Sequence, residues 1–275
     1  MDTRSLLARL AERRLPDPPW AFSDDTVMGI SVVETLDEHG RIEQDALARR
    51  FGHKLRLDPG YGRVTHQVLT EIARGGDWRV LAAGAFDGVG SMGNGGAMRA
   101  GPIGAYFAGD LDAAAEQARL AAEVTHAHLE GQAGAMAVAA AAAWAAGGGS
   151  DPAALFGAVL DVVPAGITRD TIERAASIGA DVEVLDVASQ IGNGATTLAQ
   201  DTVPFALWSV RRHLRDYESA LWTTAAALGD CDTLCAIVGS IVAVAAGGTG
   251  VPAAWRACRE PLTAFTHLAE PPAAR

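Results

Sequence analysis

The chain has 275 residues, 49% of them hydrophobic, and a formal net charge of −11 at pH 7. This length and composition suffice for one large buried core, whereas the acidic charge argues against a general nucleic-acid-binding protein, which needs a basic surface. Alanine supplies much of the hydrophobic content and only 6% of the residues are aromatic, a composition typical of closely packed helices.

The predicted elements are all helical, since the sequence has no sustained run of alternating β-branched residues. The clearest interruption is Gly147–Pro152, where Ser150 or Asp151 is expected to cap the next helix. We therefore expect a single all-α domain over residues 1–275, with a Pro-rich tail from Glu260 onward. The predicted helices cover residues 3–14, 27–40, 43–51, 64–72, 111–128, 131–146, 153–163, 170–179, 182–190, 201–215 and 234–244.

Two apolar runs, Ala133–Ala146 and Cys235–Ala246, could be mistaken for membrane spans. Each is shorter than the ~20 apolar residues that a bilayer requires, so buried core helices are expected. Residues 1–14 do not have the pattern of a signal peptide, and we expect a cytoplasmic protein without a membrane partner. The odd number of cysteines (Cys231, Cys235 and Cys258) indicates neither a disulfide framework nor a zinc site.

Two acidic segments that lie far apart in the chain share one pattern. Ser23-Asp24-Asp25-Thr26 precedes one apolar run, and Asp230-Cys231-Asp232-Thr233 precedes another. Neighbouring carboxylates repel each other unless a cation neutralises them, and Mg²⁺ and Mn²⁺ prefer oxygen ligands. If the two segments meet, the sequence predicts a site for two such ions. Helix capping is the alternative, because Ser and Asp are common N-cap residues, and the pattern alone leaves both open.

The segment 84–104 is the most glycine-dense part of the first half of the chain. Glycine lets the backbone approach a ligand closely, so N–H groups in this segment could bind a phosphate; tight turns between packed helices are the alternative. Gly88–Gly93 matches G-x-G-x-x-G, but no strand precedes it, so we do not interpret it as a dinucleotide fingerprint. His126 and His128 diverge on a helix, and His126 is either structural or in reach of a phosphate or ribose oxygen.

Taken in order, these motifs resemble those of ADP-ribosylglycohydrolases, the family of dinitrogenase reductase-activating glycohydrolase and the ADP-ribosyl-acceptor hydrolases. The resemblance covers about residues 20–250. It rests on the segments Ser23–Met28, Gly93–Gly104, Thr125-His126, Gly192-Asn193-Gly194, Val203-Pro204 and Gly229–Thr233.

The resemblance implies an all-α fold and a centre of two Mg²⁺ or Mn²⁺ ions. It also implies hydrolysis of the glycosidic bond between ADP-ribose and an ADP-ribosylated protein or a small ADP-ribose conjugate, with Asp24, Asp25 and Asp232 as catalytic residues. Phe86 and the turn at Gly192–Gly194 are expected to border the adenosine. The implied metal ligands are Ser23, Asp24, Asp25, Asp230, Asp232 and Thr233. The implied substrate-binding residues are Gly60, Gly62, Phe86, Gly90, Ser91, Met92, Gly93, Asn94, Gly95 and His126.

The sequence departs from the family pattern in two ways. The family usually begins with a helix that carries a Gly-Asp-Ala-Leu-Gly type motif, followed by a glutamate near the metals, and residues 1–20 contain neither. Ser23 stands where threonine is common, and Cys231 replaces a small residue between two aspartates, although the ligand atoms are kept. The first departure makes the chain look short at its N-terminus. It motivates an alternative function, a catalytically reduced homologue that binds ADP-ribose or has a structural role.

Overall fold

The computed structural model describes residues 9–10, 12–55, 60–248, 250–262 and 266, so the predicted helix at residues 3–14 lies mostly outside the described residues. The described part of the chain is helical and contains no β-strand, only isolated bridges from Trp20 to Arg259 and from Gly93 to Leu198. This confirms the all-α prediction. The α-helices are α2 (Asp24–His39), α3 (Gln44–Lys54), α4 (Arg63–Ala73), α5 (Trp78–Gly88), α6 (Gly101–Tyr106), α7 (Leu111–Glu123), α8 (Leu129–Ala146), α9 (Leu155–Leu160), α10 (Ile167–Ser177), α11 (Val184–Ile191), α12 (Ala199–Arg212), α13 (Tyr217–Ala225), α14 (Cys231–Ala245) and α15 (Ala253–Cys258), and the 3₁₀ helix is η2 (Ala97–Arg99).

Helix α8 is the centre of the larger group of helices. It packs against α6, α7, α12 and α14, and its alanines from Ala139 to Ala143 are fully buried. The helices approach closely: a Cβ added to Gly104 of α6 would lie 2.2 Å from the carbonyl oxygen of Ala139. Close packing of this kind needs small side chains, which explains the alanine-rich composition. No helix in the described part of the chain is long and apolar enough to cross a membrane.

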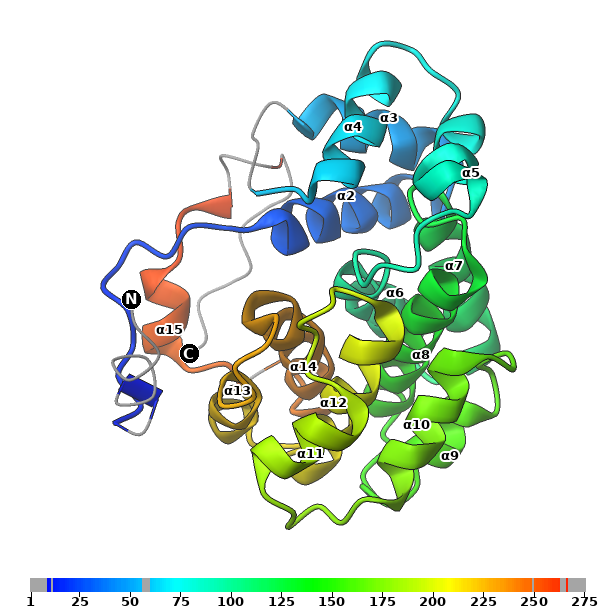
Figure 1. Cartoon of the computed structure of the whole chain (residues 1–275). Coiled ribbons are helices and arrows are strands. Elements are labelled where there is room, and N and C mark those ends of the chain that lie inside the picture. The colour runs from blue at the N-terminus through cyan, green and yellow to red at the C-terminus, as the bar shows by residue number, and fades with distance from the viewer. Residues whose placement is uncertain (1–8, 11, 56–59, 249, 263–265, 267–275) are drawn as a thin grey trace.

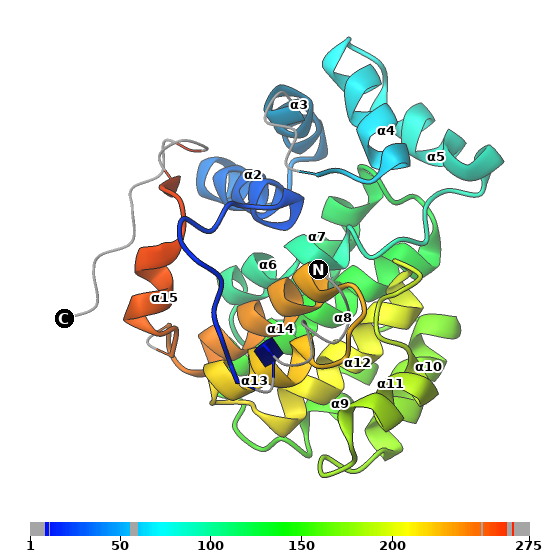
Figure 2. The ribbon, with the colours of Figure 1, turned by 60° about the vertical axis from the view of Figure 1, so that its left-hand side comes forward.

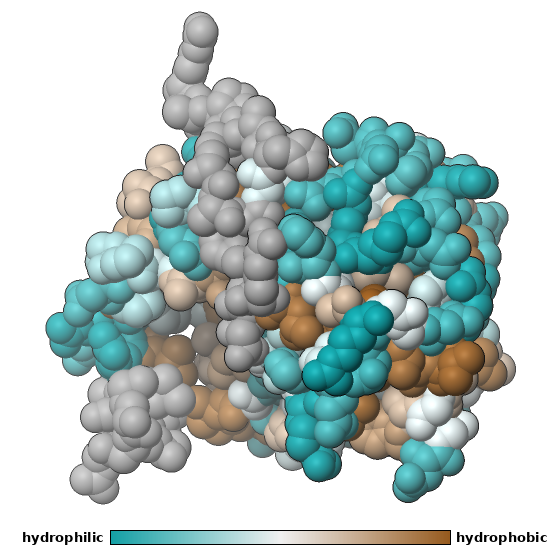
Figure 3. Space-filling model, turned by 90° about the horizontal axis from the view of Figure 1, so that it is seen from above, coloured by the Kyte–Doolittle hydropathy of each residue, from teal (hydrophilic) through white to brown (hydrophobic). Residues whose placement is uncertain are grey.

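Helices α2 to α5 form a smaller group on one side of this bundle (Figures 1 and 2). Helix α3 packs against both α2 and α4, and a buried ion pair joins the Lys54 Nζ of α3 to the Glu34 Oε2 of α2 at 2.9 Å. The face in Figure 3 is covered mainly by hydrophilic residues, with hydrophobic ones in separate patches, as expected of an acidic chain. The site described below lies between the two groups of helices.

Four of the described α-helices were missed by the sequence patterns: α5, α6, α13 and α15. Two of them, α5 and α13, begin at an aspartate cap. Asp77 Oδ1 accepts a hydrogen bond from Arg79 N at 3.0 Å before α5, and Asp216 Oδ1 accepts one from Ser219 N at 3.0 Å before α13. The glycine-dense segment 84–104 is therefore not one loop, because the end of α5, η2 and α6 all lie within it. Glycine and the small number of large apolar residues hid these short helices.

Two predicted helix boundaries are wrong. The helix predicted over residues 111–128 ends at Glu123, because Thr125 N and His126 N both donate to Ala122 O and close a turn there. Asp151 does not cap the next helix: its Oδ1 accepts from Ala153 N within the turn that precedes α9. The first difference affects the site, since Thr125 and His126 lie in the turn after α7 and not within the helix.

Candidate active site

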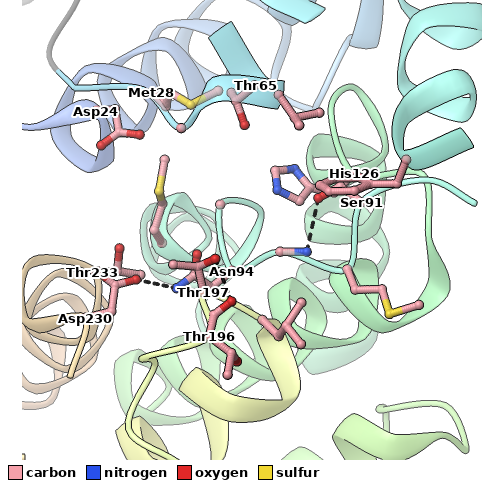
Figure 4. Close-up of a pocket in the computed structure, with 18 of the residues that line it drawn as sticks. Asp24, Met28, Thr65, Ser91, Asn94, His126, Thr196, Thr197, Asp230 and Thr233 are labelled. Carbon is pink, nitrogen blue, oxygen red and sulfur yellow. Dashed lines mark hydrogen bonds between the residues drawn. The ribbon is translucent and has the colours of Figure 1, made fainter. Parts of the chain in front are cut away.

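A pocket of about 570 Å³ lies between the two groups of helices (Figure 4). Residues from α2, from α4, from the loop that precedes η2 and from the N-terminus of α14 line it. Every residue predicted to bind substrate lines this pocket, as do four of the six predicted metal ligands: Asp24, Asp230, Asp232 and Thr233. Ser23 and Asp25 are not among the lining residues, although both are adjacent to Asp24 in the chain. The full lining is Asp24, Met28, Gly60, Gly62, Val64, Thr65, Phe86, Val89, Gly90, Ser91, Met92, Gly93, Asn94, Gly95, Met98, His126, Thr196, Thr197, Leu198, Asp230, Asp232 and Thr233.

The helix-capping interpretation of the two acidic segments is wrong for their N-cap residues. Ser23 is the N-cap of α2 and Asp230 that of α14, yet neither side chain bonds to a backbone N–H of its helix. Instead, Ser23 Oγ donates to Asp25 Oδ2 at 2.6 Å, and Asp230 Oδ2 accepts from Asn94 Nδ2 at 2.7 Å. These polar atoms are therefore directed to other side chains at the site rather than to the ends of their own helices.

The charges of the two segments act on each other. Burial, the Asp25 charge and the Asp232 charge raise the pKa of Asp24 from 3.8 to about 7. Burial raises the pKa of Asp25, partly offset by the hydroxyl of Ser23, and Asp232 raises it further. Burial and Asp232 likewise raise the pKa of Asp230. Helices α2 and α14 are in contact, and Asp24 lines the same pocket as Asp230, Asp232 and Thr233, so the two acidic segments lie close together.

The donor set of this acidic end suits a hard cation. Asp25 Oδ1 is buried and has no hydrogen-bond partner among the described residues, and, in addition to burial, the charge of Asp232 raises the pKa of both Asp24 and Asp25. Both features would be relieved by a positive ion bound to oxygen ligands. Figure 4 shows Asp24 on α2 facing Asp230 and Thr233 of α14 across the pocket. In the described ranges, no three His, Cys, Asp or Glu side chains converge closely enough to hold an ion as they stand, so the ligand assignment stays a prediction.

The other end of the pocket is formed by His126 and by the start of the loop from Gly90 to Gly95, whereas Asn94, further along this loop, reaches Asp230 (Figure 4). Asn94 anchors this loop, because its N–H donates to Thr197 O at 2.9 Å and its Nδ2 donates to Thr202 Oγ1 at 3.0 Å as well as to Asp230. Ser91, Met92 and Gly95 line the pocket, and their backbone N–H groups make no hydrogen bond to any described residue. This end therefore offers hydrogen-bond donors to a ligand.

Two glycines of this loop make room for a histidine. A Cβ on Gly95 would lie 2.8 Å from His126 Cε1, and one on Gly93 would lie 3.1 Å from His126 Nε2. The glycine-dense segment was expected either to bind a ligand or to form tight turns between packed helices. Both apply in part, because the loop lines the pocket and also packs closely against the His126 ring.

Burial and the charge of Arg99 lower the pKa of His126 from 6.5 to about 3, so the ring is neutral near pH 7. His128 points elsewhere and caps α8, as its Nδ1 accepts from Glu130 N at 3.0 Å.

Phe86 lies at the rim of the pocket on a strained stretch of backbone. Phe86 and Asp87 have φ values of 53° and 57°, a region that residues with a Cβ rarely occupy. The Phe86 side chain is 54% exposed and lies beside Val89, which also lines the pocket. An exposed aromatic ring at this position can stack on a flat ligand group.

Several pocket residues were not found from the sequence. Met28 could have been found most simply, because it follows Asp24 by one helical turn and therefore lies on the same face of α2. The turn at Gly192–Gly194 does not line the pocket; Asn193 O instead accepts from Asp230 N at 3.2 Å and supports that aspartate. The residues missed on this side are Thr196, Thr197 and Leu198, and those missed elsewhere are Val64, Thr65, Val89 and Met98.

Comparison with known proteins gives consistent results. The human protein ADP-ribosylhydrolase ARH3 is 30% identical over 269 residues, which cover 86% of this chain and 73% of the human protein. The Xenopus tropicalis protein of the same name is 28% identical over 273 residues, covering 87% of this chain and 77% of that protein. A solved structure described as an ADP-ribosylglycohydrolase-related protein complex shares the fold, with a TM-score of 0.66 and 24% identity, over 90% of this chain and 78% of that one.

The sequence model of one protein family, described as ADP-ribosylglycohydrolase, matches residues 3–273. A match over nearly the whole chain, together with relatives of this similarity, means that the protein belongs to the ADP-ribosylglycohydrolase family and is a glycosidic-bond hydrolase.

Proposed function

We propose that the protein hydrolyses the bond between the distal ribose of ADP-ribose and an acceptor, with two Mg²⁺ or Mn²⁺ ions at the acidic end of the pocket. The acceptor is a side chain of an ADP-ribosylated protein or the leaving group of a small ADP-ribose conjugate. Support comes from the relatives named ADP-ribosylhydrolases and from a pocket volume within the range of roughly 300–1,000 Å³ typical of small-molecule sites.

The observation that carries this proposal is the separation of charge along the pocket. Asp24, Asp230 and Asp232 line one end, whereas Ser91 of the Gly90–Gly95 loop and the neutral His126 lie at the other (Figure 4). A diphosphate is attracted by N–H donors and repelled by carboxylates. The diphosphate of ADP-ribose therefore belongs at the loop, which directs the distal ribose and its glycosidic bond toward the carboxylates.

The predicted metal ligands are Ser23, Asp24, Asp25, Asp230, Asp232 and Thr233. Bound to these residues, divalent cations would supply positive charge and Lewis acidity beside the ribose. Glycosidic cleavage builds positive charge on the ribose ring, and the carboxylates of Asp24 and Asp232 can stabilise that charge through space. A carboxylate oxygen of either residue can also accept the proton of the attacking water. Asn94 fixes the orientation of Asp230 by donating to its Oδ2.

The test is release of ADP-ribose from a panel of substrates. Purified protein is incubated with ADP-ribosylated arginine, ADP-ribosylated serine and O-acetyl-ADP-ribose, each with Mg²⁺, with Mn²⁺ or with a chelator, and products are separated by chromatography. We expect release from at least one substrate with metal and none with the chelator. Release that is insensitive to the chelator would overturn the metal requirement. Binding of ADP-ribose by folded protein without any release would favour the catalytically reduced homologue.

A further inference from the structure

Arg99 is a buried cation next to the pocket that has no carboxylate partner among the described residues. Its guanidinium donates to Gly95 O at 2.6 Å and to Ala121 O at 2.9 Å, and it stacks over a phenyl ring of the core. It also donates to Thr125 Oγ1 at 2.8 Å. Burying a charge that only neutral acceptors contact costs free energy of folding, which points to a specific role for these contacts.

The contact with Thr125 determines how that hydroxyl can bond. A guanidinium only donates, so the bond from Arg99 uses a lone pair of Thr125 Oγ1 and leaves the hydroxyl proton available. Thr125 is 3% exposed, and the other partner of its Oγ1 is His126 Nδ1 at 2.7 Å. No second acceptor for the hydroxyl proton lies within bonding distance in the described part of the chain. The network is satisfied only if Thr125 donates to Nδ1.

A neutral imidazole that accepts at Nδ1 carries its proton on Nε2. His126 lines the pocket, and its Nε2 makes no hydrogen bond to a described residue. The ring is held against the Gly90–Gly95 loop by its close contacts with Gly93 and Gly95. The Nε2–H group is therefore available to an acceptor in the pocket, beside the unpaired N–H groups of the same loop. Its low pKa, about 3, is consistent with a neutral ring in this position.

We propose that Arg99 and Thr125 are positioning residues that hold His126 in its Nε2-protonated tautomer, so that the pocket presents an uncharged donor to an anionic oxygen of its ligand. The chain of bonds runs from the Arg99 guanidinium through the Thr125 hydroxyl to His126 Nδ1. Arg99 also holds the carbonyl of Gly95, so one buried cation orients both the loop and the histidine. The identification of the ligand oxygen as that of a diphosphate rests on the function proposed above. The assignment of the His126 tautomer does not depend on that function.

The direct test is the protonation pattern of the His126 ring. In ¹⁵N-labelled protein, two-bond ¹H–¹⁵N correlation spectra distinguish a protonated ring nitrogen from a bare one, and His126→Gln assigns the signal. We expect Nε2 to be protonated and Nδ1 bare in the unaltered protein. A proton on Nδ1 would overturn the proposal whatever the protein hydrolyses, because the tautomer is read from the unaltered protein and His126→Gln serves only to assign the signal.

The role of Thr125 is tested by substitutions that differ only in the hydroxyl. Thr125→Val keeps the shape and removes the hydroxyl, and we expect it to shift His126 toward the other tautomer or a mixture of both. Thr125→Ser should restore the original pattern. The matched control is Thr35→Val, because Thr35 is fully buried and its hydroxyl only donates to Ser31 O. An unchanged His126 pattern in folded Thr125→Val would contradict the role of Thr125.

Ligand binding adds a functional measurement with ADP-ribose as the probe, by calorimetry. Loss of one well-oriented donor to a charged oxygen should weaken binding by roughly tenfold in Thr125→Val, and Thr125→Ser should bind as the unaltered protein does. Undiminished binding by a Thr125→Val protein whose tautomer has shifted would overturn the functional part of the proposal. If the unaltered protein does not bind ADP-ribose, the proposed function fails, and the NMR result still decides the tautomer.

Discussion

The two ends of the pocket differ in how completely the fold satisfies their polar groups. At the loop end, Asn94 has four hydrogen-bond partners and His126 is held by Thr125 and packed on glycine. At the acidic end, burial and the charge of Asp232 raise the pKa of Asp24 and Asp25, and Asp25 Oδ1 has no partner among the described residues. The loop end is thus pre-formed by the protein alone, whereas the acidic end leaves a buried carboxylate oxygen unpaired among the described residues, which fits the cation proposed to bind there.

The largest expected effect comes from removing a carboxylate of the acidic end. Asp232→Asn keeps the side-chain shape but removes one charge that faces both Asp24 and Asp25. We expect ADP-ribose release to fall on the order of a thousandfold, measured as initial rates at saturating metal. The control is Asp186→Asn, an exposed carboxylate on α11 outside the pocket, which should leave the rate unchanged. Comparable rates in the two variants would show that the acidic end is not where the reaction occurs.

The second prediction separates the two ends by their response to metal. Adding Mg²⁺ or Mn²⁺ to chelator-treated protein should raise the free energy of unfolding by about 2.7 kcal/mol at a hundredfold excess over Kd. Thermal unfolding with and without metal measures this, and Asp232→Asn should abolish the increase. Gly95→Ala, which alters only the loop end, should retain it. A metal effect that survives in Asp232→Asn would place the ion elsewhere.

The third prediction concerns the packing of the loop end. Gly95→Ala would bring a Cβ to 2.8 Å from the His126 ring, which cannot move far because it is buried. We expect a loss of about 1–3 kcal/mol in the free energy of unfolding, together with weaker binding of ADP-ribose. Gly84→Ala is the matched control, since Gly84 is an exposed helical residue with nothing near its Cβ position, and it should be slightly stabilising. Equal effects of the two substitutions would contradict the packing argument.

The fourth effect is the pH dependence of stability that His126 causes, and near neutral pH it is the smallest of the four. Its pKa in the folded state, about 3, lies below the ordinary 6.5, so the unfolded chain binds the proton more readily. The stability that depends on the neutral ring is complete above about pH 6.5 and is lost at about 1.4 kcal/mol per pH unit as the pH falls toward about 3. Urea unfolding at several pH values below 7 measures the slope. His126→Gln should reduce it, whereas His53→Gln, on an exposed histidine, should not.

The sequence predicted which residues belong to the site better than it predicted which residues those side chains contact. The paired aspartates and the glycine-dense segment were found because their signals are local, and the residues predicted to bind substrate all line the pocket. The short helices α5 and α13 were missed because glycine, or few large apolar residues, weakened the helical pattern. Thr196 to Leu198 were missed because nothing in their residue types marks a pocket wall.

The sequence by itself determined the helical class and the clusters of acidic and glycine residues, because helix propensity and charge are properties of residues and their neighbours. Only the tertiary structure decided what those residues do. Asp230 bonds to Asn94, 136 positions away, instead of capping its own helix, and Arg99 bonds to Thr125, 26 positions away. A side chain with two possible partners bonds to the one that folding brings within hydrogen-bond distance, and its burial then shifts its pKa. The local sequence specifies neither that distance nor that burial.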